Sequence, residues 1–181
     1  MQRMLALVGC LLGLSCAAVA VRAAPTPLRI AQWQPPANTA VVQEAELVHG
    51  RFDAQFRPTP QPLLRAPDAR PAWYRLQLAG DWRGESRPLL AIGGDTRARV
   101  TVYLPPAYEP RQLSPYDAGL DPRFSRHALV LVLPRHLRAD QPIYLNLGAP
   151  GQSQPLRAAV VEYAGYQIND LRHVRLSTLF A

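Results

Sequence analysis

Short runs of alternating apolar and polar residues occupy the chain from residue 72 to residue 163. This period of two predicts β-strands with one buried face, because successive side chains of a strand point to opposite sides of the sheet. The predicted strands span residues 72–78, 98–104, 143–147 and 156–163, and short apolar runs add strands at 88–92 and 127–133. Prolines or glycines end most of these runs, and short strands separated by turn residues are typical of an antiparallel β-sandwich or barrel.

Three segments of this region depart from simple alternation. The run at residues 127–133 is apolar on both faces, which predicts a central strand with both faces covered. The sequence Gly93-Gly94-Asp95 predicts a hairpin turn. Residues 105–126 are rich in proline and arginine, so we expect them to form a loop.

The chain before residue 72 is rich in proline and predicts less regular structure. Residues 24–40 read as a proline-rich polar leader with little regular structure. Residues 41–53 are compatible with one short strand or one helical turn, and periodicity does not decide between them. Residues 57–71 are expected to form an extended loop, because prolines recur throughout them.

The pattern changes again at the C-terminal end. Apolar residues recur at steps of three and four along residues 164–181, which predicts a helix with one apolar face. The last residues are apolar, and we expect a membrane segment to follow them. The expected organisation is a signal peptide at 1–23, the leader at 24–40, a β-sandwich at 41–163 and a helix at 164–181.

The N-terminal residues have the three parts of a secretory signal peptide: the positive Arg3, an apolar run from Met4 to Val21, and small residues after it. Cleavage after Ala20 or after Ala23 fits the small-x-small rule. We favour Ala23, because it leaves the preceding arginine outside the apolar run. Lipid attachment at Cys10 and an uncleaved anchor are the alternatives. Cleavage after Ala23 removes both cysteines, so the exported domain is expected to have no disulfide.

Composition and charge exclude several classes of function. The formal net charge is +7, and all 20 basic residues are arginine. Chemistry that depends on lysine, such as a phosphate-loop lysine or a Schiff base, is therefore excluded. The arginines are scattered singly along an exported chain, whereas nucleic-acid binding requires clustered cations with aromatic stacking platforms. We therefore expect no nucleic-acid partner.

The sequence shows no constellation of catalytic or metal-binding residues. The four histidines lack the H-E-x-x-H or H-x-H spacing of a metal site. Glu109, Asp117 and Asp121 have the residue type that glycoside hydrolysis needs, but they lie in the predicted loop 105–126, where solvated charge is far commoner. We predict that the chain is not an enzyme and holds no cofactor or metal. An exported hydrolase is the alternative.

The polar faces of three predicted strands carry residue types that suit a binding surface. The candidate ligand-binding residues are Trp73, Arg75 and Gln77 on the first strand, Arg99, Thr101 and Tyr103 on the second, and Tyr144 and Asn146 on the third. Aromatic rings stack on apolar ligand faces, and arginine and amide groups donate directional hydrogen bonds. This combination favours a small-molecule ligand, either a carbohydrate or a carboxylate. The alternative is that these residues cover a solvated sheet face or pack under a loop.

Several of these segments together resemble a known family. The segments that carry the resemblance are Phe52 and Phe56 before Ala72-Trp73-Tyr74-Arg75-Leu76, then Arg99-Val100-Thr101-Val102-Tyr103-Leu104, Leu133-Pro134 before Ile143-Tyr144-Leu145, and finally Asp170-Leu171-Arg172. Over residues 40–181 the series resembles the extracellular domain, type 2, of bacterial seven-transmembrane receptors with diverse intracellular signalling modules (7TMR-DISM).

The resemblance implies both a fold and a role. The fold would be a galactose-binding-like, jelly-roll β-sandwich on the periplasmic side of the inner membrane, with a juxtamembrane helix. Seven membrane helices and a cytoplasmic output module, often a diguanylate cyclase or a histidine kinase, would follow, and this chain ends before them. The expected function is that of a ligand-sensing input domain, with a homodimer as a candidate assembly. The alternative is a free-standing periplasmic carbohydrate-binding module.

Overall fold

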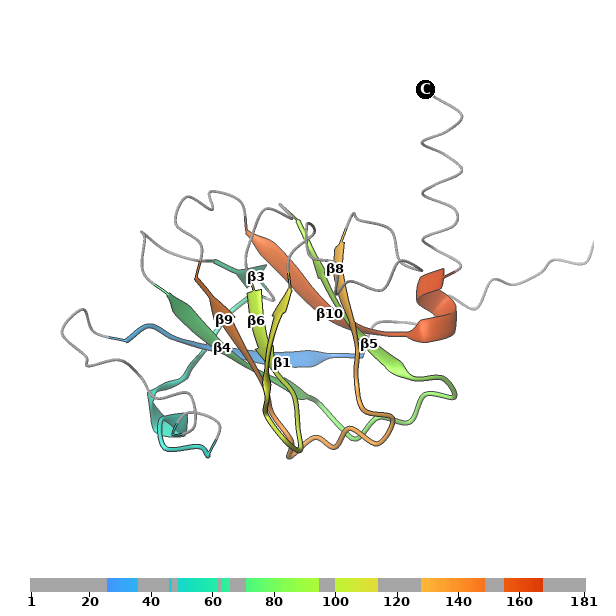
Figure 1. Ribbon diagram of the computed structural model, residues 1–181, viewed down its shortest axis with the longest axis horizontal. Coiled ribbons are helices and arrows are strands. Elements are labelled where there is room, and N and C mark those ends of the chain that lie inside the picture. The colour runs from blue at the N-terminus through green and yellow to red at the C-terminus, as the bar shows by residue number, and fades with distance from the viewer. Residues whose placement is uncertain are drawn as a thin grey trace, which may run out of the picture.

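The structure is a computed structural model that describes residues 26–35, 46, 49–61, 63–65, 71–94, 100–113, 128–148 and 155–167. The described strands form two antiparallel sheets that pack face to face (Figure 1). The larger sheet has the order β2 (Arg57–Pro58), β1 (Leu28–Trp33), β4 (Ala72–Leu78), β9 (Ile143–Leu147), β6 (Val100–Tyr103), β7 (Pro110–Leu113). The smaller sheet has the order β3 (Leu63–Leu64), β10 (Leu156–Glu162), β5 (Pro88–Gly93), β8 (Ala128–Val132). The predicted all-β fold of antiparallel strands is confirmed.

Side chains from both sheets meet in one apolar core. Tyr74 and Leu76 of β4 lie in the same buried cluster as Leu90 of β5 and Val160 of β10, and none of the four has measurable exposure. Burying one such aliphatic side chain contributes about 1.5–3 kcal/mol, so this core is the main source of stability. The Tyr74 hydroxyl reaches the edge of the core, where it accepts a hydrogen bond from the Arg65 N–H and donates one to the Arg65 carbonyl, each at 2.6 Å.

Four of the predicted strands agree closely with the structure. β4 and β9 have the predicted bounds, and β5 and β10 differ from theirs by one residue at the C-terminal end. In β4 the buried residues Tyr74, Leu76 and Leu78 face the core, while Arg75 and Gln77 on the opposite face are partly exposed.

The proline-rich leader contains a strand, so the prediction of little regular structure at 24–40 is wrong for β1. β1 pairs with β4 along its whole length, from Leu28 opposite Leu78 to Trp33 opposite Trp73. The sandwich therefore begins inside the predicted leader. The prolines of this segment lie before and after β1 and remove no N–H from it, which is why proline density was misleading here.

The predicted loop 105–126 contains strand β7, which sequence analysis missed. Among the described strands, β7 is the last of the larger sheet and pairs with β6 alone, from Val100 opposite Leu113 to Tyr103 opposite Pro110. An edge strand of this kind buries little, and only Leu113 of its four residues is buried. It can also begin at a proline, because one edge of the strand needs no N–H donor.

The Gly93-Gly94-Asp95 sequence does not make the predicted hairpin. β5 and β6, on either side of it, belong to different sheets, so the chain crosses between layers here. Gly94 has a φ of 130°, and a Cβ atom on it would lie 3.0 Å from the Pro155 carbonyl oxygen. The glycine is therefore required for its backbone conformation and for its close approach to the residue before β10.

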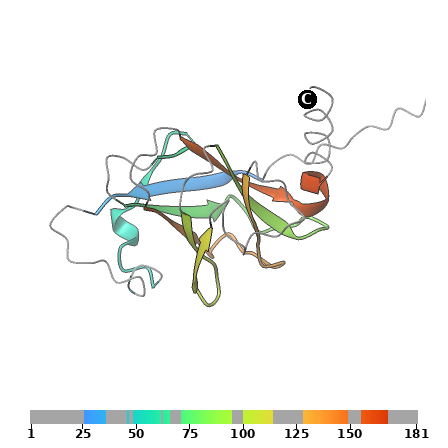
Figure 2. The same ribbon diagram turned by 45° about the horizontal axis from the view of Figure 1, so that its top comes forward.

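β8 is the last strand of the smaller sheet in the described part of the chain, so the prediction of a central strand at 127–133 is wrong. Its second apolar face is nevertheless covered. Val130 of β8 and Leu89 of β5 are buried beside Tyr163 and Tyr166, on the sheet face that points away from the core. Residues 163–167 are helical and follow β10 directly, as Figure 2 shows. The outer face of the smaller sheet is apolar because tyrosines of this helical turn pack on it.

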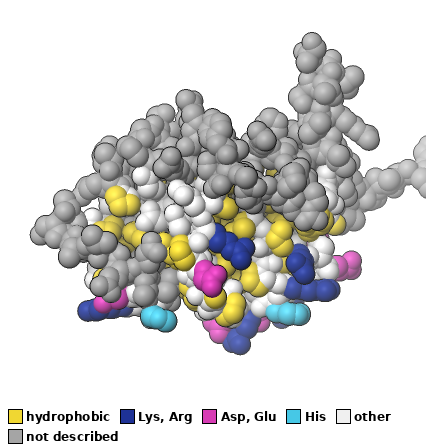
Figure 3. Space-filling model, viewed as in Figure 1, with side chains coloured by type: hydrophobic (Ala, Val, Ile, Leu, Met, Phe, Trp, Pro, Cys, Tyr) yellow, Lys and Arg dark blue, Asp and Glu magenta, His cyan; other side chains and the backbone are white. Residues whose placement is uncertain are grey.

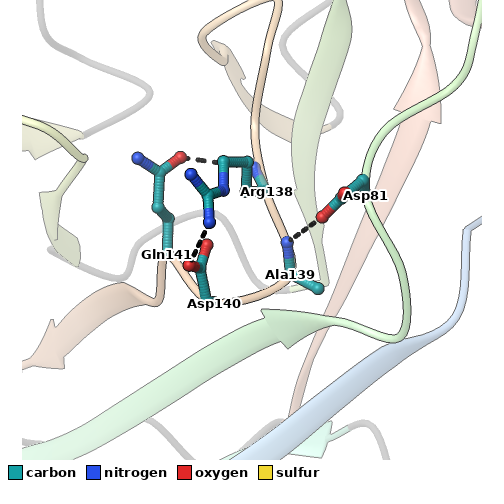
Figure 4. Close-up of polar contacts among 5 residues, drawn as sticks. All are labelled: Asp81, Arg138, Ala139, Asp140 and Gln141. Atoms are coloured by element: carbon teal, nitrogen blue, oxygen red, sulfur yellow. Dashed lines mark hydrogen bonds and ion pairs between the residues drawn. The ribbon is translucent and has the colours of Figure 1, made fainter.

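A hydrogen bond joins the β4–β5 connection to the β8–β9 connection (Figure 4). Asp81, between β4 and β5, accepts a hydrogen bond from the Ala139 N–H at 2.9 Å, and Ala139 lies between β8 and β9. Within the same turn, Arg138 pairs with Asp140 at 2.6 Å. These contacts fix the chain that leads into β9.

Several predictions concern residues outside the described part of the chain. The signal peptide at 1–23, the loop carboxylates Asp117 and Asp121, and the predicted helix beyond residue 167 are among them. None of the helices in the described segments is long and apolar enough to cross a bilayer.

Candidate ligand-binding site

The strand register brings the predicted binding residues together. β9 lies between β4 and β6 in the larger sheet. Arg75, Tyr144 and Tyr103 form one row across these strands. Trp73, Asn146 and Thr101 form the next row. Gln77 follows on the same face of β4, and Arg99 lies outside the described residues. The prediction of one shared face is therefore correct for every predicted residue that the structure describes.

The aromatic members of this face are buried. Trp73 is 3 % exposed, and Tyr103 and Tyr144 are each 1 % exposed. They belong to an outer aromatic cluster on the larger sheet, away from the main core. We use this name for Ala31, Trp33, Phe56, Trp73, Tyr103 and Tyr144, with Phe52 and Tyr108 packed against them.

Residues 52–56, which include the 3₁₀ helix at Asp53–Gln55, cover the outer aromatic cluster, and we call them the covering segment. Phe52, just before this helix, stacks on Trp33 with ring centroids 4.8 Å apart and planes 17° apart. Phe56, just after it, contacts Tyr144 with a centroid distance of 6.0 Å. Offset and tilted ring pairs of this kind add to stability beyond the area they bury. Both phenylalanines come from the residues that carried the family resemblance, and here they act as packing residues.

Asp53 links this covering segment to the polar side chains of the sheet. Its carboxylate accepts a hydrogen bond from the Tyr144 hydroxyl at 3.1 Å and pairs with Nη1 of Arg75 at 3.1 Å. The Arg75 guanidinium also lies over the Phe56 ring, 5.4 Å from its centroid. The Nε atom of Arg75 is buried and has no hydrogen-bond partner in the described structure. Two different interactions therefore hold the Arg75 side chain in place, the ion pair with Asp53 and the contact with the Phe56 ring.

Burial and charge together change the titration of Tyr144. Burial raises the pKa of its phenol well above the ordinary value, and the Asp53 carboxylate and its hydrogen bond raise it further, while Arg75 opposes the rise. The phenol is therefore protonated at neutral pH and acts as a donor to Asp53. Tyr144 is buried under a loop, which is the alternative that sequence analysis left open.

The predicted polar residues Gln77, Thr101 and Asn146 stay partly exposed on this face. Their role in ligand binding stays a prediction. So does the absence of a metal site, although no group of three histidine, cysteine, aspartate or glutamate side chains comes together within the described segments. Figure 3 shows acidic and basic side chains interspersed on the face it presents.

A second candidate site was not predicted from the sequence. A cavity of about 510 Å³ opens beside the edge of β10, with walls from the start of β1, the turn after β2 and residues 157–159 of β10. Its volume lies within the range of about 300–1,000 Å³ that is usual for small-molecule sites. The sequence signal that points to it is weak: Arg157 interrupts an otherwise apolar strand start between Leu156 and Ala158.

A scan against protein-family models and a search of curated proteins find no match for this chain. The 7TMR-DISM resemblance therefore stays a prediction from the sequence.

Proposed function

We propose that this chain is the exported ligand-binding domain of a membrane signalling receptor, the sensory input part of a 7TMR-DISM-type protein. In this proposal the two sheets form a jelly-roll sandwich of the galactose-binding-like type on the periplasmic side of the inner membrane. The domain itself performs no chemistry. Binding of a small molecule changes the state of the C-terminal segment, which leads to the membrane.

The observation that carries this proposal is the direct passage from β10 into a helix. β10 lies inside the smaller sheet, between β3 and β5, and residues 163–167 follow it as helix without a connecting loop (Figure 1). The Tyr163 N–H donates to the Arg87 carbonyl at 3.0 Å, so the junction is tied to the residue before β5. A displacement of β10 would therefore reach the helix through a continuous backbone.

Coupling of this kind requires a ligand to bind two arrangements of the domain with different affinity. A site that contacts β10 meets this requirement most directly, because β10 is the last strand before the helix. The apolar stripe of residues 164–181 would then continue as the juxtamembrane helix of the receptor.

Export is the first test of this proposal. Alkaline phosphatase fused after residue 181 folds only outside the cytosol, so the fusion should be active with the complete chain and inactive when residues 1–23 are deleted. Equal activity of the two fusions, or activity of neither, would contradict export.

The reading frame of the gene after codon 181 is the second test. Seven apolar spans followed by a signalling module support the receptor. A stop codon at that point, together with binding of the exported domain to a glycan, supports the free-standing carbohydrate-binding module instead.

A further inference from the structure

The cavity beside β10 lies in a gap between two strand pairings. On this edge of β10, β3 pairs with Leu156 and Arg157, and the Thr26 N–H donates to the Val160 carbonyl at 3.0 Å. Ala158 and Ala159 lie between these two pairings and both line the cavity. The opening therefore results from β1 leaving β10 after Thr26 to join the larger sheet.

The walls of the cavity are aliphatic. Leu28 and Ile30 of β1 contribute from one side and Ala158 of β10 from the other. The described residues that line the cavity include no aromatic and no acidic side chain. A carbohydrate site normally offers an aromatic ring for the sugar to stack on, so this lining favours an aliphatic group over a sugar.

The cavity is also lined by residues with polar side chains. Thr26, Gln61 and Arg157 are among the residues that line the cavity, and their side chains make no hydrogen bond or ion pair in the described structure. Gln61 and Arg157 are exposed, so water solvates both in the absence of a ligand. Thr59 differs from them, because its hydroxyl is within donor distance of two carbonyl oxygens, at 3.2 Å to Ile30 and 2.9 Å to Gln61. Thr59 thus fixes the turn that presents Gln61.

The described residues that line the cavity carry positive charge and no negative charge. Arg157 is its charged residue within the described structure, and no lining carboxylate opposes it. A guanidinium binds a carboxylate through two parallel hydrogen bonds, which are among the strongest that side chains make. The donors of Gln61 and Thr26 can add to the same recognition.

We propose that this cavity binds a small aliphatic carboxylate, with the hydrocarbon chain against Leu28 and Ile30 and the carboxylate paired with Arg157. This inference rests on the proposed ligand-binding role and names its ligand class. It also places the ligand on β10, a few residues before the strand becomes helix.

The test uses the protein as the expressing cells produce it from the complete gene sequence, in calorimetric titrations with hexanoate, octanoate and decanoate. Octanol and octylamine are the matched controls, because they keep the chain and change the head group. We expect saturable binding of at least one carboxylate and at least tenfold weaker binding of the alcohol and the amine. Equal binding of the three head groups would overturn the proposal.

Two arginine variants test whether Arg157 is the residue that binds the carboxylate. Arg157→Gln should weaken carboxylate binding by about 10- to 100-fold, the equivalent of a charged hydrogen bond of about 1.5–3 kcal/mol. Arg111→Gln, an exposed arginine on the edge strand β7, should leave the affinity unchanged. An equal loss in both variants would show a general effect of net charge and would overturn the assignment to Arg157.

The remaining outcomes separate this inference from the proposed function. Binding of sugars without any binding of the carboxylates overturns the cavity proposal and leaves the ligand-binding role standing. Carboxylate binding by a domain that is not exported supports the cavity and contradicts the receptor. Absence of binding across the carboxylate series overturns the inference, whatever the export test shows.

Discussion

The outer aromatic cluster and the cavity beside β10 differ in what their polar groups contact. In the cluster, the Tyr144 hydroxyl and the Arg75 guanidinium both meet the Asp53 carboxylate, and rings from the covering segment bury the aromatic side chains. At the cavity, Arg157 and Gln61 line an open volume, and their exposed side chains make no hydrogen bond or ion pair in the described structure. The cluster has the residue types of a binding site, but its rings are buried, and the Tyr144 hydroxyl and Nη1 of Arg75 are already paired with Asp53, which leaves the buried Nε of Arg75 without a partner in the described structure. An open volume lined by polar residues that make no contact within the protein is therefore a better guide to binding than residue type alone.

The largest expected difference between the two regions comes from Trp73→Ala. Because Trp73 is 3 % exposed and packs on Tyr103 with ring centroids 5.6 Å apart, its loss should lower the free energy of unfolding by about 3–5 kcal/mol. Urea denaturation measures this loss. Carboxylate binding should persist below the unfolding transition. A stable variant that loses ligand binding would instead make Trp73 a binding residue.

Asp53→Ala should have the next largest effect. It removes the acceptor of a buried phenol and the counter-ion of Arg75, which should cost about 1–3 kcal/mol. Asp140→Ala is the matched control, because Asp140 pairs with Arg138 at the surface, and it should cost less than about 0.5 kcal/mol (Figure 4). Similar losses in the two variants would contradict a specific role for Asp53 in holding the covering segment.

Tyr144→Phe tests the electrostatics of the cluster through pH. The pKa of Tyr144 is raised in the folded state, so above about pH 10 the unfolded chain releases a proton that the folded chain keeps. The free energy of unfolding should therefore fall as the pH rises through that range, and it should fall less steeply in Tyr144→Phe. At neutral pH the variant should lose only about 0.5–1.5 kcal/mol. Equal alkaline slopes in denaturation curves of the two proteins would contradict the raised pKa.

Arg157→Gln should have the smallest effect on stability. Because Arg157 is exposed and makes no ion pair in the described structure, the free energy of unfolding should change by less than about 0.5 kcal/mol. Thermal denaturation without ligand measures this change. A loss comparable to that of Asp53→Ala would mean that Arg157 has a structural role, and the contrast between the two regions would disappear.

Local sequence patterns predicted the strands and the shared face but not their surroundings. A period of two places Trp73 and Arg75 on the polar face of β4. It also places Tyr144 and Asn146, which are two residues apart, on one face of β9. The residues of the shared face could therefore be named before the sheet order was known. The order β4–β9–β6, and the folding of Phe52 and Phe56 over that face, depend on contacts between distant residues, which local patterns do not contain. The burial of Tyr144 could therefore not be decided in advance.

The elements that were missed have physical reasons of their own. β1 lies among prolines that flank it without interrupting it, and β7 buries only Leu113, so its apolar signal is weak. The cavity is built from three segments that are far apart in sequence, and two of them come from regions expected to be irregular. The opening itself results from the separation of β1 from β10 after Thr26, a feature set by contacts between distant residues, which local patterns do not contain.

Amide chemical shifts of the isotope-labelled domain during a titration with octanoate test the central claim most directly. We expect saturable shifts at Thr26, residues 28–30, Thr59, Gln61 and residues 157–159, continuing into the helical residues 163–167, with little change at Trp73, Tyr103 and Tyr144. Shifts centred on Gln77, Thr101 and Asn146, with none along β10, would show that the ligand binds the outer face of the larger sheet and would contradict the account.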